Sequence, residues 1–139
     1  MENRREFLSI LAALGAAASG LQIGQAQTTT PQPVRTAGIV SLPTPYDKQS
    51  ATVQELHLAP GRPSWAHKHP GFVLGYVIEG EVRFQVAGEP ERILRSGDIF
   101  YEPPGATHLK AESASADKPA RVVAIIIADS SKTQMVEPA

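Results

Sequence analysis

The sequence contains no cysteine among its 139 residues. Disulfide bonds, thiolate nucleophiles and thiolate metal ligands are therefore excluded, so any metal ion must be held by His, Asp or Glu. Basic residues are not in excess either, with 13 Lys and Arg against 14 Asp and Glu. Because binding to nucleic acid or to an anionic membrane surface requires such an excess, neither partner is expected.

The N-terminal stretch lacks an apolar run of the roughly 20 residues that cross a bilayer, so no membrane anchor is expected. It has Arg4 and Arg5, a short apolar run over residues 7–14, and small residues through Gly20. This arrangement is typical of a secretory signal. We expect cleavage after Ala26, which removes residues 1–26 and leaves 113 residues, enough for one domain.

The first residues also resemble a twin-arginine export signal. They keep the arginine pair and Phe7-Leu8, but Asn3 stands where Ser is usual and Ser9 where Lys is usual. Such signals are addresses read by a receptor, and the resemblance implies export of a folded protein with its cofactor inserted. We expect a periplasmic or secreted protein, and the departures leave the general secretory route open.

Residues 27–50 are rich in Thr, Pro and Gln and are expected to form a flexible arm, with an edge strand over residues 39–42. From residue 51 onwards, short apolar runs are broken by Gly and Pro, without helical periodicity. Many short, closely spaced strands predict an all-β sandwich or barrel over residues 51–139. The expected strands are 52–58, 72–78, 81–87, 92–94, 99–101, 107–110 and 121–128. The run Ile125-Ile126-Ile127 predicts a strand that is buried on both faces.

Three of the four histidines lie in two informative places. His67-Lys68-His69 should be extended, and side chains at i and i+2 of a strand point to one face, roughly 6–7 Å apart. Two imidazoles at this spacing can converge on one ion with bonds near ~2.1 Å. His108 follows Pro103-Pro104-Gly105, a rigid turn that would bring a neighbouring strand back against the first. We predict one divalent transition metal ion on these three histidines, the alternative being solvated or core histidines.

The spacing around these histidines resembles both motifs of the cupin family. Gly61, His67, His69 and Gly80 fit the first motif, and the second is matched by Gly97, Pro103, Gly105 and His108. The resemblance covers residues 61–112. It implies a small antiparallel β-barrel of the cupin or jelly-roll type with a metal ion in its mouth.

Two positions depart from the family pattern. Val73 stands where the family has a ligand Glu, and Glu112 replaces the final Asn of the second motif. Three neutral imidazoles leave a divalent ion with its full charge, which makes it a stronger Lewis acid with more open positions. Loss of the Glu is also compatible with a protein that has lost catalysis and kept a binding pocket.

Glu102 places a carboxylate near the predicted barrel mouth. It is a candidate fourth ligand, a partner that orients a histidine, or a general base, and the alternative is a solvated strand end. Tyr101 is a second candidate for moving protons. Trp65 and Phe72 flank the histidine pair as possible pocket walls or core residues. Two others are set aside: Tyr76 is expected to be a plain strand residue, and His57 to lie outside the metal site.

Three functions agree with these residues. The ligand set resembles the three-histidine dioxygenases that cleave β-diketones, which implies Fe(II), a small chelating enol or phenolic substrate, and dioxygen. A lyase or isomerase would use the ion as a Lewis acid without oxygen, with Mn, Zn, Ni or Cu also open. A periplasmic binding module would not react at all. Cupins are often dimers, so a homodimer is expected, with the N-terminal arm pairing across its interface.

Overall fold

A computed structural model describes residues 34–139, and the regular secondary structure of this part is all strand. The predicted all-β fold is therefore confirmed, whereas the expected signal peptide lies outside the described residues. No helix between residues 34 and 139 is long and apolar enough to cross a membrane. The strands are β1 (Val34–Ser41), β2 (Gln49–Leu58), β3 (His67–Lys68), β4 (Phe72–Glu79), β5 (Glu81–Val86), β6 (Arg92–Arg95), β7 (Ile99–Glu102), β8 (His108–Ser113), β9 (Ala120–Asp129) and β10 (Glu137–Pro138).

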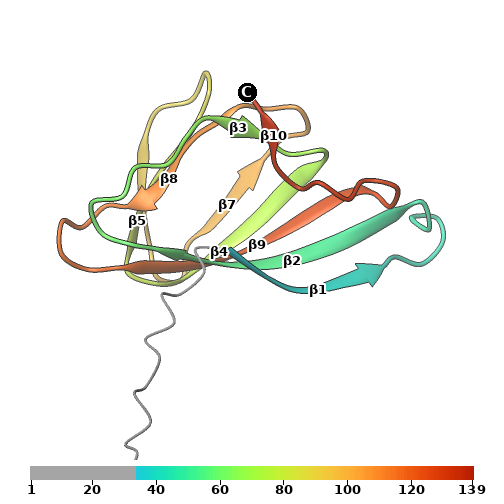
Figure 1. Cartoon of the computed structure of the whole chain (residues 1–139), viewed down its shortest axis with the longest axis horizontal. Helices are drawn as coiled ribbons and strands as arrows, with labels where there is room; N and C mark the ends of the chain where they lie inside the picture. The colour runs from blue at the N-terminus through green and yellow to red at the C-terminus, as the bar shows by residue number, and fades with distance from the viewer. Residues whose placement is uncertain (1–33) are drawn as a thin grey trace, which may run out of the picture. The chain divides into compact units, whose positions relative to one another are not determined.

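The strands form two antiparallel five-stranded sheets, in the orders β1-β2-β9-β4-β7 and β10-β3-β8-β5-β6 (Figure 1). Their inner faces share one apolar core, in which Phe84 of β5 packs on Phe100 of β7 with ring centroids 4.9 Å apart. The predicted barrel is thus two facing sheets, which among residues 34–139 are not joined into one hydrogen-bonded ring.

Strand β9 shows how the sheet divides its side chains between core and surface. Its burial alternates from Ala120 to Ala128, as expected of a pleated strand. Ile126 is completely buried, but Ile125 and Ile127 point to the other face and are only half-buried. The expectation that this run is buried on both faces is therefore wrong.

Strand β1 occupies much of the segment that was expected to be a flexible arm. It pairs antiparallel with β2, from Val34 opposite Leu56 to Ser41 opposite Ser50. Without β1, the edge of β2 would have unpaired backbone N–H and C=O groups. Main-chain hydrogen bonds to these groups hold β1, and the amino-acid composition of the segment does not predict them. Residues 34–41 of the expected arm thus form an edge strand, which is longer than the strand expected over residues 39–42.

Candidate metal centre

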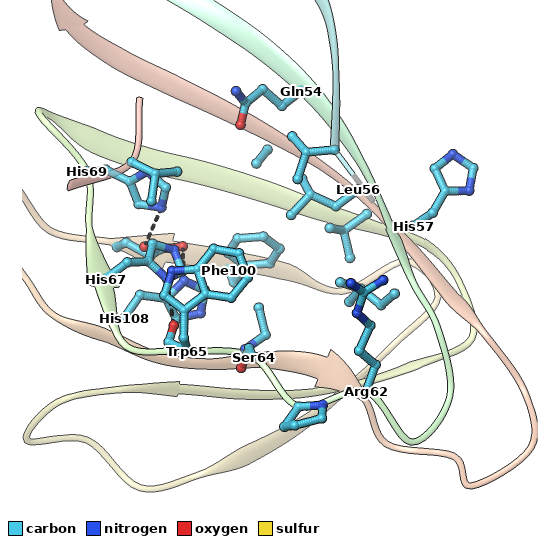
Figure 2. Close-up of a pocket in the computed structure, with 18 of the residues that line it drawn as sticks. Gln54, Leu56, His57, Arg62, Ser64, Trp65, His67, His69, Phe100 and His108 are labelled. Carbon is cyan, nitrogen blue, oxygen red and sulfur yellow. Dashed lines mark hydrogen bonds and ion pairs between the residues drawn. The ribbon is translucent and has the colours of Figure 1, made fainter. Parts of the chain in front are cut away.

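The three predicted histidines come together at one end of the two sheets. His67 of β3 lies directly opposite His108 of β8, and His69 follows one residue after β3. One ring nitrogen of each lies within 4.8 Å of the other two. The His67 ring centroid is 4.9 Å from that of His69 and 5.0 Å from that of His108 (Figure 2). The structure therefore brings the predicted ligands into one group.

Backbone carbonyls fix which nitrogen of each ring is free. The Nδ1 atoms of His67 and His69 lie 2.8 Å and 2.6 Å from the carbonyl oxygens of Trp65 and Met135, and Nε2 of His108 lies 2.7 Å from that of Lys110. Because a carbonyl oxygen only accepts, each of these nitrogens carries the hydrogen. Nε2 of His67, Nε2 of His69 and Nδ1 of His108 are left as lone-pair donors to an ion.

Glu102 of β7 stands beside this group with its carboxylate buried. Its side chain is only 3% exposed, so the solvated strand end is excluded. Oε1 lies 3.2 Å from Nδ1 of His108, and Oε2 lies 3.5 Å from Nε2 of His69. Within the described residues, Oε2 of Glu102 and Nδ1 of His108 have no hydrogen-bond partner.

In the contacts of Glu102 with His69 and His108, both facing atoms are hydrogen-bond acceptors. All three imidazole hydrogens are used on outward carbonyls, so the atoms that face one another across the centre carry lone pairs and negative charge. Buried acceptors at this separation repel unless a cation or a proton lies between them. Imidazole nitrogens with a nearby carboxylate suit a divalent transition metal ion. The site therefore fits the metal that was predicted.

Burial also determines the charge of these groups near neutral pH. Desolvation raises the pKa of Glu102 from 4.5 to about 7. Desolvation lowers the pKa of His108 to about 4, and it lowers the pKa of His69 as well. Both imidazoles are therefore neutral at pH 7 and able to bind a metal ion.

The register of β4 and β7 accounts for the position of the carboxylate. Val73, which stands where the family motif has a glutamate, lies directly opposite Glu102. Both side chains are buried and face inward. The Glu102 carboxylate on β7 thus lies in the part of the interior that a glutamate at position 73 of β4 would face.

Tyr101 and Phe72 lie away from the histidines. Tyr101 is 48% exposed on the outer face of β7, because neighbouring residues of a strand point in opposite directions. Its ring lies 6.2 Å from that of Phe72, and neither residue lines the cavity at the histidines. Tyr101 is therefore not a catalytic candidate in this site. Tyr76, as expected, is a plain strand residue and is half exposed.

A cavity of about 230 Å³ opens beside the histidines. Trp65 forms part of its wall and not of the core, and Phe100 is another part of the wall (Figure 2). Gly75 makes room for the Phe100 ring, since a Cβ at this glycine would lie 1.9 Å from it. His57 borders the cavity but pairs with Glu55 at 3.1 Å and is not in the three-histidine group.

Several residues of the cavity were not found from the sequence. They come from β1, β2, the segment between β2 and β3, and the C-terminal segment, namely Val34, Gln54, Leu56, Arg62, Ser64 and Val136. None belongs to a motif that carries chemistry. Their contribution depends on the pairing of distant strands, which single-sequence patterns do not give.

Glu112, at the position of the motif Asn, has a structural contact. Its Oε2 accepts a hydrogen bond of 3.1 Å from the backbone N–H of Ser64. The Ser64 hydroxyl accepts one of 3.0 Å from the N–H of Ala111. Together these bonds hold the segment that precedes His67 against β8.

The sequence pattern of the cupin domain matches residues 54–126. The chain belongs to the cupin family. No curated protein has a sequence that matches this cupin.

Solved cupin folds resemble the structure at low sequence identity. A cupin-like protein from Thermotoga maritima is 27% identical with a TM-score of 0.53, over 67% of this chain and 65% of its own. The DMSP lyase DddQ from Ruegeria pomeroyi is 20% identical with a TM-score of 0.55, over 64% of this chain. The match spans only 43% of the lyase, and at this identity it shows the fold alone.

Proposed function

We propose that the protein is an exported, mononuclear metal-dependent cupin enzyme acting on a small chelating substrate, such as a diketone, enol or phenol. The convergence of three free imidazole nitrogens beside an unpartnered buried carboxylate supports this proposal. A divalent ion, Fe(II) in first place, would supply Lewis acidity there and would activate a chelated substrate toward dioxygen. His67, His69 and His108 would hold it.

In this proposal Glu102 moves a proton. Its Oε2 has no hydrogen-bond partner in the described part of the chain, and Glu102 borders the cavity. A diketone bound there would pass a proton from the carbon between its carbonyls to Oε2, leaving the enolate as the chelating species. Glu102 is buried, and the apolar side chains of Leu56 and Phe100 line the same cavity, which limits the access of water to the carboxylate.

A non-oxidative lyase or isomerase is the second candidate, because proton transfer by Glu102 requires no oxygen. The likeness to the DMSP lyase does not favour it further, since that match shows only the fold. Oxygen dependence separates the two candidates. A binding module would show saturable binding without turnover.

The deciding experiment is metal analysis of purified protein followed by oxygen-uptake assays on β-diketones and phenolic compounds. We expect about one transition metal ion per chain and substrate-dependent oxygen uptake. Replacing His67, His69 or His108 with Ala should remove most of the metal, whereas His57→Ala should retain it. Full metal content in all four variants would rule out the site, and turnover in the absence of oxygen would favour the second candidate.

Export is tested separately. Changing Arg4 and Arg5 together to Lys should keep the protein in the cytoplasm if the twin-arginine receptor reads this signal. N-terminal sequencing of exported protein should begin at or near Gln27. Unimpaired export of the double variant would assign the general secretory route instead.

A further inference from the structure

The cavity is lined mainly by apolar side chains, and Gln54, His57 and Ser64 are polar lining residues in addition to the two sites described next. The three histidines and Glu102 form one polar group, while Arg62 lies elsewhere on the lining. In the view of Figure 2 the Arg62 guanidinium lies apart from the histidine rings, on the other side of Phe100. A molecule that fills this cavity therefore meets a cationic side chain away from the metal centre.

Arg62 differs from the other arginines of residues 34–139. Four of them form ion pairs with glutamates, and Arg92 lies over the Phe84 ring at 5.5 Å; the four are Arg35, Arg83, Arg95 and Arg121. Arg62 has no carboxylate or aromatic partner within this described range. Its guanidinium is thus available to a ligand.

The backbone under Arg62 is held in place on both sides. Gly61 has a φ of +68°, and Pro63 limits the conformation of the residue before it. The next residue, Ser64, is tied to β8 by its hydrogen bonds to Glu112 and Ala111. A fixed attachment point reduces the entropy lost when the side chain binds a ligand.

We propose that Arg62 is the anion-binding residue of the cavity, so that the substrate is a small apolar molecule with a chelating group at the histidines and a carboxylate at Arg62. This inference rests on the proposed function for its chelating half. The guanidinium matches a carboxylate with two parallel hydrogen bonds. Arg62 is the only Lys or Arg that lines the described cavity, which favours a monoanion over a phosphate.

The size of the cavity agrees with such a substrate. Its volume of about 230 Å³ lies below the ~300 Å³ at which pockets for drug-sized ligands begin. The apolar lining residues include Leu56 and Phe100, which give an aliphatic or aromatic spacer an apolar environment. The substrate class is therefore a short carboxylic acid that carries a diketone, enol or phenol at its other end.

The test compares each acid with its uncharged amide on metal-loaded protein by isothermal titration calorimetry. The probes are β-diketones whose terminal carboxylate follows two to four methylenes, their amides, and the pair hexanoate and hexanamide. In the parent we expect at least one acid to bind about 10- to 100-fold more tightly than its amide. Arg62→Gln should abolish this preference, Arg62→Lys should keep part of it, and Arg95→Gln should leave it unchanged.

The two proposals fail in different ways. Equal binding of acid and amide in the parent, or an unchanged preference in Arg62→Gln, would overturn the role of Arg62. The second result would mean that the carboxylate sits on the metal ion. If no diketone binds but hexanoate keeps an Arg62-dependent preference over hexanamide, the anion site stands and the chelating substrate is rejected.

Discussion

At the scale of single residues, variants of Glu102 and Val73 test most directly whether Glu102 is a general base or a metal ligand. Glu102 contacts His69 and His108 but does not belong to the group of mutually close ligand nitrogens. We therefore expect Glu102→Gln to keep its metal and to lose turnover by a factor on the order of 10²–10⁴. Metal analysis and initial rates on the same samples measure both quantities.

Val73→Glu provides the matched test from the opposite strand. Val73 is buried and faces inward, directly across from Glu102, so a carboxylate there would approach the same interior. In the parent protein, Val73→Glu should tighten metal retention and lower any activity that needs open positions on the ion. If Glu102→Gln loses metal and Val73→Glu restores it, Glu102 is a ligand rather than a base.

The raised pKa of Glu102 makes the stability of the metal-free protein depend on pH. Its carboxyl has a pKa of about 7 in the fold against an ordinary 4.5, so between these values the folded protein binds more protons than the unfolded chain. The free energy of unfolding must then fall as pH rises. Relative to Glu102→Gln, the parent should lose on the order of 3 kcal/mol between pH 4 and 8. Urea unfolding of both proteins across this pH range measures the difference between their free energies of unfolding. A difference that does not change with pH would contradict the burial of the Glu102 carboxylate.

The sequence located the three histidines and Glu102 because motif spacing and residue type are enough to find them. Tyr101 was chosen with Glu102, although two consecutive residues of one strand cannot face the same site. Arg62 belongs to no motif, and its relation to the cavity depends on the path of the segment between β2 and β3. Such a relation follows from tertiary structure.

At the scale of secondary-structure elements, the C-terminal segment completes the candidate metal centre. The Met135 carbonyl accepts the Nδ1 hydrogen of His69, and β10 pairs with β3 through Pro138 opposite His67 (Figure 1). Ending the chain after Gln134 should lower metal affinity about 10- to 100-fold, because His69 loses the group that orients it. Competition with a chromophoric chelator measures the affinity. Met135→Ala keeps the carbonyl and should bind metal like the parent, so an equal loss in both variants would argue against this role.

Seven of the ten described strands lie where short apolar runs between Gly and Pro predicted them. Alternation predicts the inner and outer faces of β5, which begins at Glu81 as expected and ends at Val86, one residue before the expected end. β10 is two residues long and has no apolar pattern of its own. Like the first half of β1, which lies outside the edge strand expected over residues 39–42, β10 forms by pairing with an existing strand, so its sequence carries little signal.

At the scale of the whole molecule, one face of the first sheet leaves large apolar side chains exposed. Leu74 lies opposite Tyr101 and Tyr76 opposite Ile99, and these four are 47–72% exposed. On the same face, Leu74 also lies opposite the half-buried Ile125 of β9. We expect a second copy of the chain to cover this face, since an apolar patch of this kind indicates an interface.

Light scattering coupled to size-exclusion chromatography tests the homodimer. The parent should elute with the mass of two chains, and Leu74→Glu combined with Ile99→Glu should give the mass of one. Ile93→Glu, an exposed position on the other sheet, is the control that should remain dimeric. A monomeric parent would show that this face is not covered by a second copy.

The C-terminal segment and the absence of cysteine together offer an optical reporter. Val136 borders the cavity and the Met135 carbonyl accepts the Nδ1 hydrogen of His69, so this segment contacts both the cavity and the candidate metal centre. Ala139→Cys would introduce the sole thiol of the chain at an exposed position. A fluorophore attached there would change its emission as metal and substrate enter, without competing reactions elsewhere on the protein.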